Sequence, residues 1–242
     1  MLDRQLDLPT PDGVMGTFVT HPEEGGPHPV VLLLMDAPGM REELRDMARR
    51  LGTAGYYVMA PNLYYRDVAE FSIFSGDPAH TRERMWELMQ RLDDDMVVGD
   101  AEVLLAAAED DPAADTRRVG VMGFCMSGPF AVAVACARPT QVRAAASLHG
   151  VRLWGPGSPS ERITPDTGEL YFACAEFDDF VPAGTVDGLE RHLAAVGAHA
   201  RVERYPGTHH GFTFPGRDGA YDKPSAERMW ERLHALFSRT LH

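Results

Sequence analysis

Apolar and polar residues follow one another along this chain in a pattern that predicts strands and helices in regular alternation. Continuous apolar runs of five or six residues are typical of strands buried on both faces, whereas apolar residues three or four positions apart indicate helices. Mainly apolar runs predict strands at 30–35, 56–60, 118–122, 144–148 and 170–174, and the more polar segment 200–205 predicts a strand that is more exposed than the others. A turn at 9–16, with Pro11, Asp12 and Gly13, indicates two further strands at the N-terminus.

The segments between these strands predict helices. Apolar residues at helical spacing mark the stretches 44–51, 85–92, 97–108, 130–138, 189–196 and 229–237. Two stretches, 61–78 and 151–169, lack this spacing and are expected to be loops. Strands that alternate with helices predict an α/β fold with a mostly parallel central sheet covered by helices on both faces. No repeat or linker divides the sequence, so we expect one domain over residues 1–242.

Composition narrows the classes of partner. The formal net charge of −13 argues against nucleic acid and anionic membranes. No apolar run has the length of a membrane span, and the polar N-terminus is unlike a secretory signal. The three cysteines form no metal-binding pattern, so no metal is expected. Their odd number indicates reduced thiols and a cytoplasmic protein.

The segment from Gly123 to Gly128 carries the candidate chemistry. It joins a predicted strand to a predicted helix, and the residues two positions before and after Cys125 are the small Gly123 and Ser127. Small residues around a central nucleophile are typical of a nucleophile elbow, here with cysteine in place of serine. Backbone N–H groups at the following helix N-terminus favour a thiolate. The alternative is a buried cysteine in a glycine-rich turn.

A cysteine nucleophile needs a base, and the base needs an orienting acid. In α/β-hydrolases the chain order is nucleophile, acid, histidine. Asp178 follows the predicted strand 170–174, and His210 follows the predicted strand 200–205. The neighbouring Asp179 and His209 are expected to be solvated loop residues. The spacing therefore predicts a triad of Cys125, Asp178 and His210 at the carboxyl ends of three strands.

The chain resembles the dienelactone hydrolase family of α/β-hydrolases over nearly its whole length. The resemblance is carried by the segments 60–64, 123–128, 178–182 and 210–212. It implies the α/β-hydrolase fold without a separate cap domain, and Cys125, Asp178 and His210 as nucleophile, acid and base. It also implies hydrolysis of a small-molecule ester or lactone without a metal or organic cofactor.

The same resemblance assigns roles around the nucleophile. The segment Met35–Gly39 is similar to the family loop that supplies one oxyanion N–H, and because Pro38 has no N–H, Ala37 is the implied donor. Met126 is the second implied donor. Asp36 stands where family members typically carry a glutamate that contacts the thiol and controls its ionisation. Asp36 either has that role or caps the helix that begins near Glu42.

Substrate-binding residues follow from the resemblance as well. Family members clamp a substrate carboxylate with two arginines, and Arg82 is similar to the first of them. Phe214 occupies the position of the second, so Arg217 is the alternative cation in that loop. Trp86 is expected to wall the pocket or to pack in the core. His149 either faces the pocket or makes a structural hydrogen bond.

Two other classes of function remain open from the sequence. One is a non-hydrolytic small-molecule binding protein on the same fold. The other is a redox-responsive protein that uses Cys125 as a sensor, although no second cysteine lies close to it in sequence. Neither the particular substrate nor the oligomeric state is marked by a motif.

Overall fold

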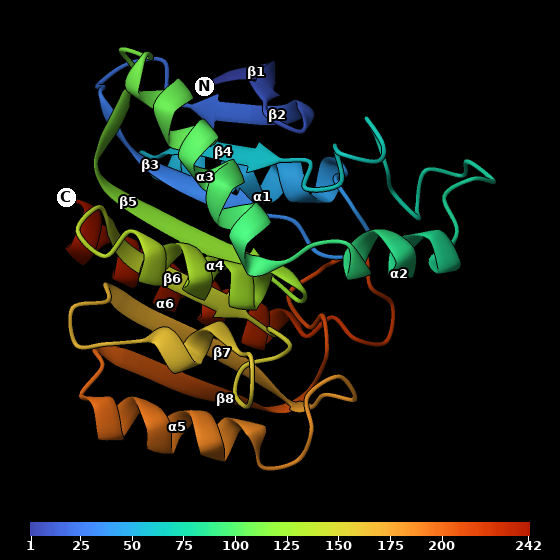
Figure 1. Ribbon diagram of the computed structural model, residues 1–242, viewed down its shortest axis with the longest axis vertical. Helices are drawn as coiled ribbons and strands as arrows, with labels where there is room; N and C mark the ends of the chain where they lie inside the picture. The colour runs from blue at the N-terminus through green and yellow to red at the C-terminus, as the bar shows by residue number, and fades with distance from the viewer. The chain divides into compact units, whose positions relative to one another are not determined.

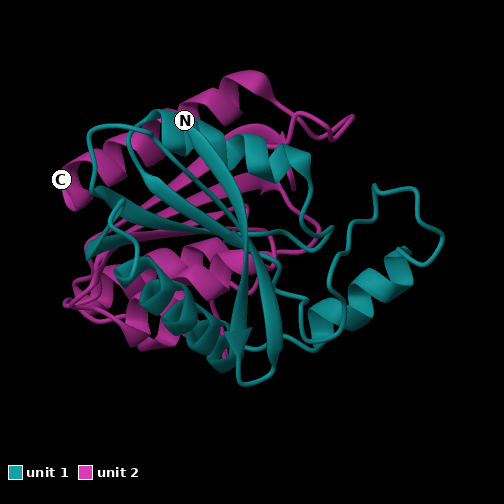
Figure 2. Ribbon diagram, turned by 90° about the horizontal axis from the view of Figure 1, so that it is seen from above, with its two compact units in different colours: residues 1–119 teal, residues 120–242 magenta.

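The computed structural model describes residues 1–242, which form two compact units (Figure 2). Unit 1 comprises Met1–Val119 and unit 2 comprises Gly120–His242. Strand β5 (Ala114–Phe124) belongs to both units, because the boundary falls within it.

Unit 1 contains an N-terminal hairpin and three further strands in the order β1-β2-β4-β3-β5. Strands β1 and β2 pair antiparallel, β2 also pairs antiparallel with β4, and β3 and β4 are parallel. Helices α1 and α3 cover opposite faces of this part of the sheet, while α2 stands away from it (Figures 1 and 2). The elements are β1 (Leu2–Thr10), β2 (Gly13–His21), β3 (His28–Leu34), α1 (Glu42–Thr53), β4 (Tyr57–Pro61), α2 (Arg82–Gln90) and α3 (Asp94–Glu109).

Unit 2 has the strand order β5-β6-β7-β8, with parallel pairing of β6 with β7 and of β7 with β8. Helices α4 and α6 pack on opposite faces of these strands (Figures 1 and 2). Every residue of α4 from Ser127 to Ala135 is buried, which agrees with its nearly uniform apolar sequence. The elements are α4 (Ser127–Ala137), β6 (Val142–Leu148), β7 (Glu169–Phe177), α5 (Thr185–Val196), β8 (Ala200–His209) and α6 (Lys223–Leu241).

The predicted fold class and the predicted alternation of elements are confirmed, with differences at two places. Strands β7 and β8 run beyond their apolar segments, because pairing resumes after a bulge and joins Phe177 to His209. The stretch predicted as a loop at 151–169 contains a short 3₁₀ helix, η1 (Pro159–Arg162), which the side chain of Ser158 caps. None of the helices combines the length and hydropathy that crossing a bilayer requires.

The ends of the unit 2 strands place four reactive side chains at one edge of the sheet. Strands β5, β6, β7 and β8 end at Phe124, Leu148, Phe177 and His209. The next residues in the chain are Cys125, His149, Asp178 and His210. Parallel strands bring their carboxyl ends to the same edge, which is where α/β folds bind their ligands.

Candidate active site

Cys125 lies at the apex of a tight turn between β5 and α4. Its φ angle of 53° is in the left-handed region, which L-residues adopt at an energetic cost. A Cβ atom at Gly123 would collide with the carbonyl oxygen of Ser127, and one at Gly128 would lie 2.7 Å from Cα of Gly150. Only glycine therefore fits at either position, and the turn has the geometry of a nucleophile elbow.

Backbone hydrogen bonds hold this turn against the end of β6. The N–H of Cys125 donates to the carbonyl of Leu148 at 3.1 Å, and its own carbonyl accepts from Gly128 and Val151 at 3.2 and 3.1 Å. Met126 follows as the N-cap residue of α4, with helical backbone angles. The sulfur of Cys125 is thus fixed next to a helix N-terminus, where the helix dipole favours negative charge.

Asp178 and His210 form a hydrogen-bonded pair between the ends of β7 and β8. Nδ1 of His210 lies 2.8 Å from Oδ2 of Asp178, and both side chains are less than a tenth exposed, at 8% and 6%. By contrast, Asp179 and His209 are exposed, and His209 packs against Phe177. The structure therefore brings together Asp178 and His210, the two residues that the sequence selected, whereas the residues next to each of them in sequence are exposed.

The environment of His210 favours the charged imidazolium. Burial lowers its pKa, but the hydrogen bond with Asp178 and the interaction with Cys125 raise it by more, so that the pKa is about 9. Nε2 is buried and has no partner that meets hydrogen-bond distance and angle limits. The interaction with the Cys125 thiol is therefore a looser contact than a formed bond, as is common in sites without substrate.

His149 lies beside this pair and is completely enclosed. Its Nε2 is 2.9 Å from Oγ1 of Thr213, and its ring meets that of His210 edge to face with centroids 5.0 Å apart. Burial first, and then the charges of His210 and Arg217, hold its pKa well below the usual value. The structural hydrogen bond that the sequence left as one alternative is present.

The loop after His210 is packed rather than open. Phe214 is 0% exposed and lies between Phe124 and His149, with ring centroids 4.9 and 5.5 Å away. The guanidinium of Arg217 lies 5.0 Å from the Phe214 ring centre and against Gly211. Because Phe214 is fully buried, we expect it to support this loop from below rather than to touch a substrate.

In unit 1, Asp36 is fully buried and paired with Arg41. Nη1 and Nη2 of Arg41 lie 2.5 and 3.3 Å from the two carboxylate oxygens, and the arginine side chain is also mostly buried. Arg41 occupies the N-cap position of α1, so Asp36 is tied to the start of that helix through this side chain. The pair leaves little uncompensated charge on Asp36.

Hydrogen bonds hold the loop that contains Ala37 in place. The carbonyl of Ala37 accepts from the hydroxyl of Tyr64 at 2.9 Å, and the N–H of Gly39 donates to the carbonyl of Asp36 at 3.0 Å. Gly39 has a φ angle of 90°, and a Cβ atom there would collide with the backbone of Phe71. The N–H of Ala37 makes no hydrogen bond to the chain, which leaves it available as a donor.

Arg82 and Trp86 lie on one short helix. Arg82 is the first residue of α2, directly after the capping Thr81, and it is exposed. Trp86 is 40% exposed, whereas Met85 and Leu88 are the buried residues of this helix. The alternative that Trp86 is a core residue is therefore wrong in this structure.

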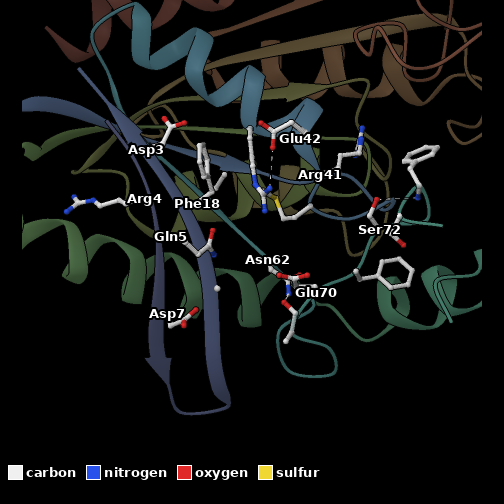
Figure 3. Close-up of a pocket in the computed structure, with 18 of the residues that line it drawn as sticks. Asp3, Arg4, Gln5, Asp7, Phe18, Arg41, Glu42, Asn62, Glu70 and Ser72 are labelled. Atoms are coloured by element: carbon white, nitrogen blue, oxygen red, sulfur yellow. Dashed lines mark hydrogen bonds and ion pairs between the residues drawn. The ribbon is translucent and has the colours of Figure 1, made fainter. Parts of the chain in front are cut away.

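Unit 1 also contains a pocket of about 880 Å³ that the sequence did not predict. Figure 3 shows Phe18, Arg41, Glu42 and Asn62 among the side chains around it. Its lining contains four arginines and four carboxylates, and Arg49 contacts Asp3 and Glu42 at 2.7 and 2.5 Å. The lining thus carries no surplus charge that would select a charged ligand.

Sequence reasoning missed two contacts at the candidate site. Thr213 forms a hydrogen bond with His149 and lies three residues after His210. Arg41 forms a hydrogen bond with Asp36 and lies five residues after Asp36. Both are polar residues close in sequence to a candidate, which was the available signal.

The tight turn at Cys125 and the hydrogen-bonded pair of Asp178 and His210 lie at the carboxyl ends of β5, β7 and β8 in an α/β-hydrolase fold. The dienelactone hydrolase family model matches residues 15–241. The chain belongs to this family.

Individual relatives agree with that assignment. The chain is 28% identical over 221 residues to the carboxymethylenebutenolidase of Rhodococcus opacus, which covers 87% of this chain and 81% of the relative. It is 28% identical over 241 residues to a Methylorubrum extorquens protein provisionally named a carboxymethylenebutenolidase, covering 96% and 79%. A provisionally named dienelactone hydrolase structure from Klebsiella pneumoniae subsp. pneumoniae MGH 78578 has a TM-score of 0.86 and 27% identity, covering 98% of each chain.

Proposed function

We propose that this protein hydrolyses lactones or activated esters through a thioester on Cys125, with His210 as base and Asp178 as orienting acid. The observation that carries the proposal is the 2.8 Å contact between His210 and Asp178, in a site where the Cys125 thiol raises the pKa of the same imidazole. The family membership and the name of the Rhodococcus opacus relative favour a lactone as the substrate.

The first step is attack of the thiolate on the acyl carbon. With the pKa of His210 at about 9, the imidazolium is present at neutral pH and can neutralise a thiolate beside it. The S–C bond forms as the carbonyl π electrons move to oxygen. We assign the N–H groups of Ala37 and Met126 to this oxyanion. Collapse of the adduct expels the ring or ester oxygen, which takes a proton from His210.

The second step is hydrolysis of the thioester, and it needs His210 as a neutral base. Acylation removes the charge on sulfur, and that charge is one of the causes that raise the pKa of His210. The pKa of the imidazole therefore falls once the thioester forms, so that Nε2 can accept a proton from the attacking water at neutral pH. Asp178 retains its bond to Nδ1 throughout and fixes the tautomer.

Thiolate chemistry also limits the substrate class. Thiolate is a good leaving group from the tetrahedral adduct, so acylation succeeds when the other leaving group is better still. Enol esters and enol lactones meet this condition because an enolate is a stable leaving group. Amides do not meet it without further assistance.

The direct test is to trap the thioester. Wild-type protein mixed with 4-nitrophenyl acetate and quenched in acid should carry one acetyl group on the peptide that contains Cys125. The Cys125→Ala variant should carry none and should lose turnover. Cys136→Ala is the matched control, because Cys136 is also partly exposed but lies away from the elbow, near the carbonyl of Pro159.

Two results would refute the proposal. Undiminished turnover in Cys125→Ala would exclude the covalent mechanism. Binding of the ester by wild-type protein without release of 4-nitrophenolate would favour the non-hydrolytic alternative instead.

A further inference from the structure

We propose that His149 is a positioning residue for His210, acting as a neutral ring that joins the nucleophile turn to the loop of the catalytic base. The inference rests on the proposed roles of Cys125 and His210. It concerns a buried histidine to which that mechanism assigns no step.

His149 has contacts on both sides of the reaction centre. On the nucleophile side, it directly follows Leu148, whose carbonyl accepts from the N–H of Cys125 at 3.1 Å. On the base side, its Nε2 lies 2.9 Å from Oγ1 of Thr213, in the loop that begins at His210. One residue thus connects the two segments whose separation sets the distance between thiol and imidazole.

The backbone at His149 is held in a costly conformation. Its φ angle of 38° is in the left-handed region, which residues other than glycine adopt infrequently. The N–H of His149 donates to the carbonyl of Ala173 on β7 at 2.8 Å, which anchors the strained residue. Such strain persists only where the surroundings over-determine the conformation, and it is concentrated at functional sites.

The partners of the ring show that it is neutral. Nδ1 is buried and has no hydrogen-bond partner, while Nε2 has Thr213. An imidazolium would leave a charged N–H buried without an acceptor, which is strongly unfavourable. The other groups that face the ring are the aromatic rings of Phe124, Phe212 and Phe214, and the charges of His210 and Arg217. None of these supplies a counter-charge.

A neutral ring at this place suits a neighbour that must become charged. The His149 and His210 rings meet edge to face with centroids 5.0 Å apart, so a charge on His149 would repel the imidazolium of His210. The neutral ring instead restricts movement of the His210 imidazole, and the bond to Thr213 holds the loop that follows it. Displacing a catalytic group by about 1 Å can reduce a rate by about a hundredfold. Loss of the contacts that hold His210 in place should therefore have a measurable effect on the reaction rate.

The test removes the hydrogen bond between His149 and Thr213 by changing Thr213 rather than His149. Thr213→Val deletes the hydroxyl with little change in shape, and Thr213→Ser keeps the hydroxyl as the conservative control. The readout is the rate of Cys125 alkylation by iodoacetamide as a function of pH, which reports on the thiolate–imidazolium pair without any substrate. We expect Thr213→Val to lower this rate about tenfold at neutral pH, and Thr213→Ser to keep it within about twofold of wild type. His149→Phe should behave like Thr213→Val.

A second background separates positioning from general loss of structure. In His210→Ala protein, adding Thr213→Val should change the alkylation rate no further, because the residue through which His149 acts is gone. Wild-type alkylation kinetics in Thr213→Val, or an equal loss in the His210→Ala background, would overturn the inference. Failure of the proposed hydrolysis would show separately, as absent ester turnover in wild-type protein whose alkylation still depends on Thr213.

Discussion

Both carboxylate oxygens of Asp178 are occupied, one by His210 and the other by the backbone of Phe180. Oδ2 lies 2.8 Å from Nδ1 of His210, and Oδ1 accepts from the N–H of Phe180 at 3.0 Å. The carboxylate is therefore fixed in rotation, and it selects the tautomer in which Nδ1 carries the proton. Asp179, one residue on, is exposed and has no comparable place in the site.

This difference predicts unequal effects of two isosteric changes. Asp178→Asn should lower kcat/KM by about a hundredfold or more, because an amide can stabilise the wrong tautomer of His210. Asp179→Asn should leave kcat/KM nearly unchanged. Steady-state hydrolysis of 4-nitrophenyl acetate by the two variants measures this, and equal losses would mean that Asp178 is not the orienting acid.

A second matched pair is His210→Ala and His209→Ala. Loss of the base should reduce kcat by several orders of magnitude, whereas His209 is exposed and stacks only on Phe177 at 5.4 Å. Pre-steady-state kinetics should show the acylation burst in His209→Ala and not in His210→Ala. The reverse result would transfer the base role to His209.

The pKa of His210 predicts a pH dependence of stability. In the folded protein this pKa is about 9, above the ordinary value of 6.5. A group whose pKa is raised on folding contributes stability that is fully present below its unfolded pKa and is lost as pH rises through its folded pKa. We therefore expect the contribution of His210 to the free energy of unfolding to decline between about pH 6.5 and pH 9. Urea titrations of wild type and His210→Ala over this range measure it, and identical pH profiles would contradict it.

Asp36→Asn tests whether this carboxylate acts on the thiol. If it does, the amide should shift the pH profile of Cys125 alkylation towards lower pH, because a neighbouring negative charge disfavours thiolate. The shift should be small, since Arg41 already pairs with Asp36 at 2.5 Å. Arg41→Met should move the profile in the opposite direction by leaving that charge uncompensated. A profile unchanged in both variants would restrict the pair to a structural role in unit 1.

The charge preference for substrate is the fifth prediction. Phe214 stands where family members carry a second clamping arginine, and loss of one bidentate contact costs about 1.5–3 kcal/mol, or about tenfold to a hundredfold in affinity. We expect a neutral ester or lactone to be hydrolysed at least as well as its carboxylate-bearing analogue, and Arg82→Ala to affect both modestly. The comparison uses kcat/KM at low salt, where screening is weak. A strong preference for the carboxylate that disappears in Arg82→Ala would show that Arg82 binds it.

Strand ends were the part of the site that the sequence predicted best. Cys125 and Asp178 follow mainly apolar strand segments, and His210 follows the more polar strand segment 200–205, so their place at the sheet edge follows from topology alone. Strand ends alone did not separate neighbouring residues: the following Gly211 and Phe212 favoured His210 over His209, and the family resemblance favoured Asp178 over Asp179. Burial agrees with both choices.

Side-chain partners were less predictable, because they depend on tertiary packing rather than on the spacing of apolar residues along the sequence. Nothing in the local pattern distinguishes a buried Phe214 from one that lines a pocket. In the structure it is 0% exposed and packs against the rings of Phe124 at the end of β5 and His149, the residue after β6. The Asp36–Arg41 pair is similar: its components are visible in the sequence, but burial of both carboxylate and guanidinium is a tertiary feature.

The turn at Cys125 has a consequence for how this protein tolerates mutation. Gly123, Gly128 and Gly150 leave no room for a methyl group: it would collide with the backbone of Ser127 at Gly123, and with the hydroxyl of Ser147 at Gly128 and Gly150. A library of all single substitutions, selected for folded protein rather than for activity, should therefore be depleted at these glycines while tolerating many residues at Asp179 or His209. Cys125 has a different constraint: glycine there would relieve the left-handed strain, by about 1 kcal/mol, but would remove the proposed nucleophile. Folding and chemistry thus place opposite demands on adjacent positions of one turn.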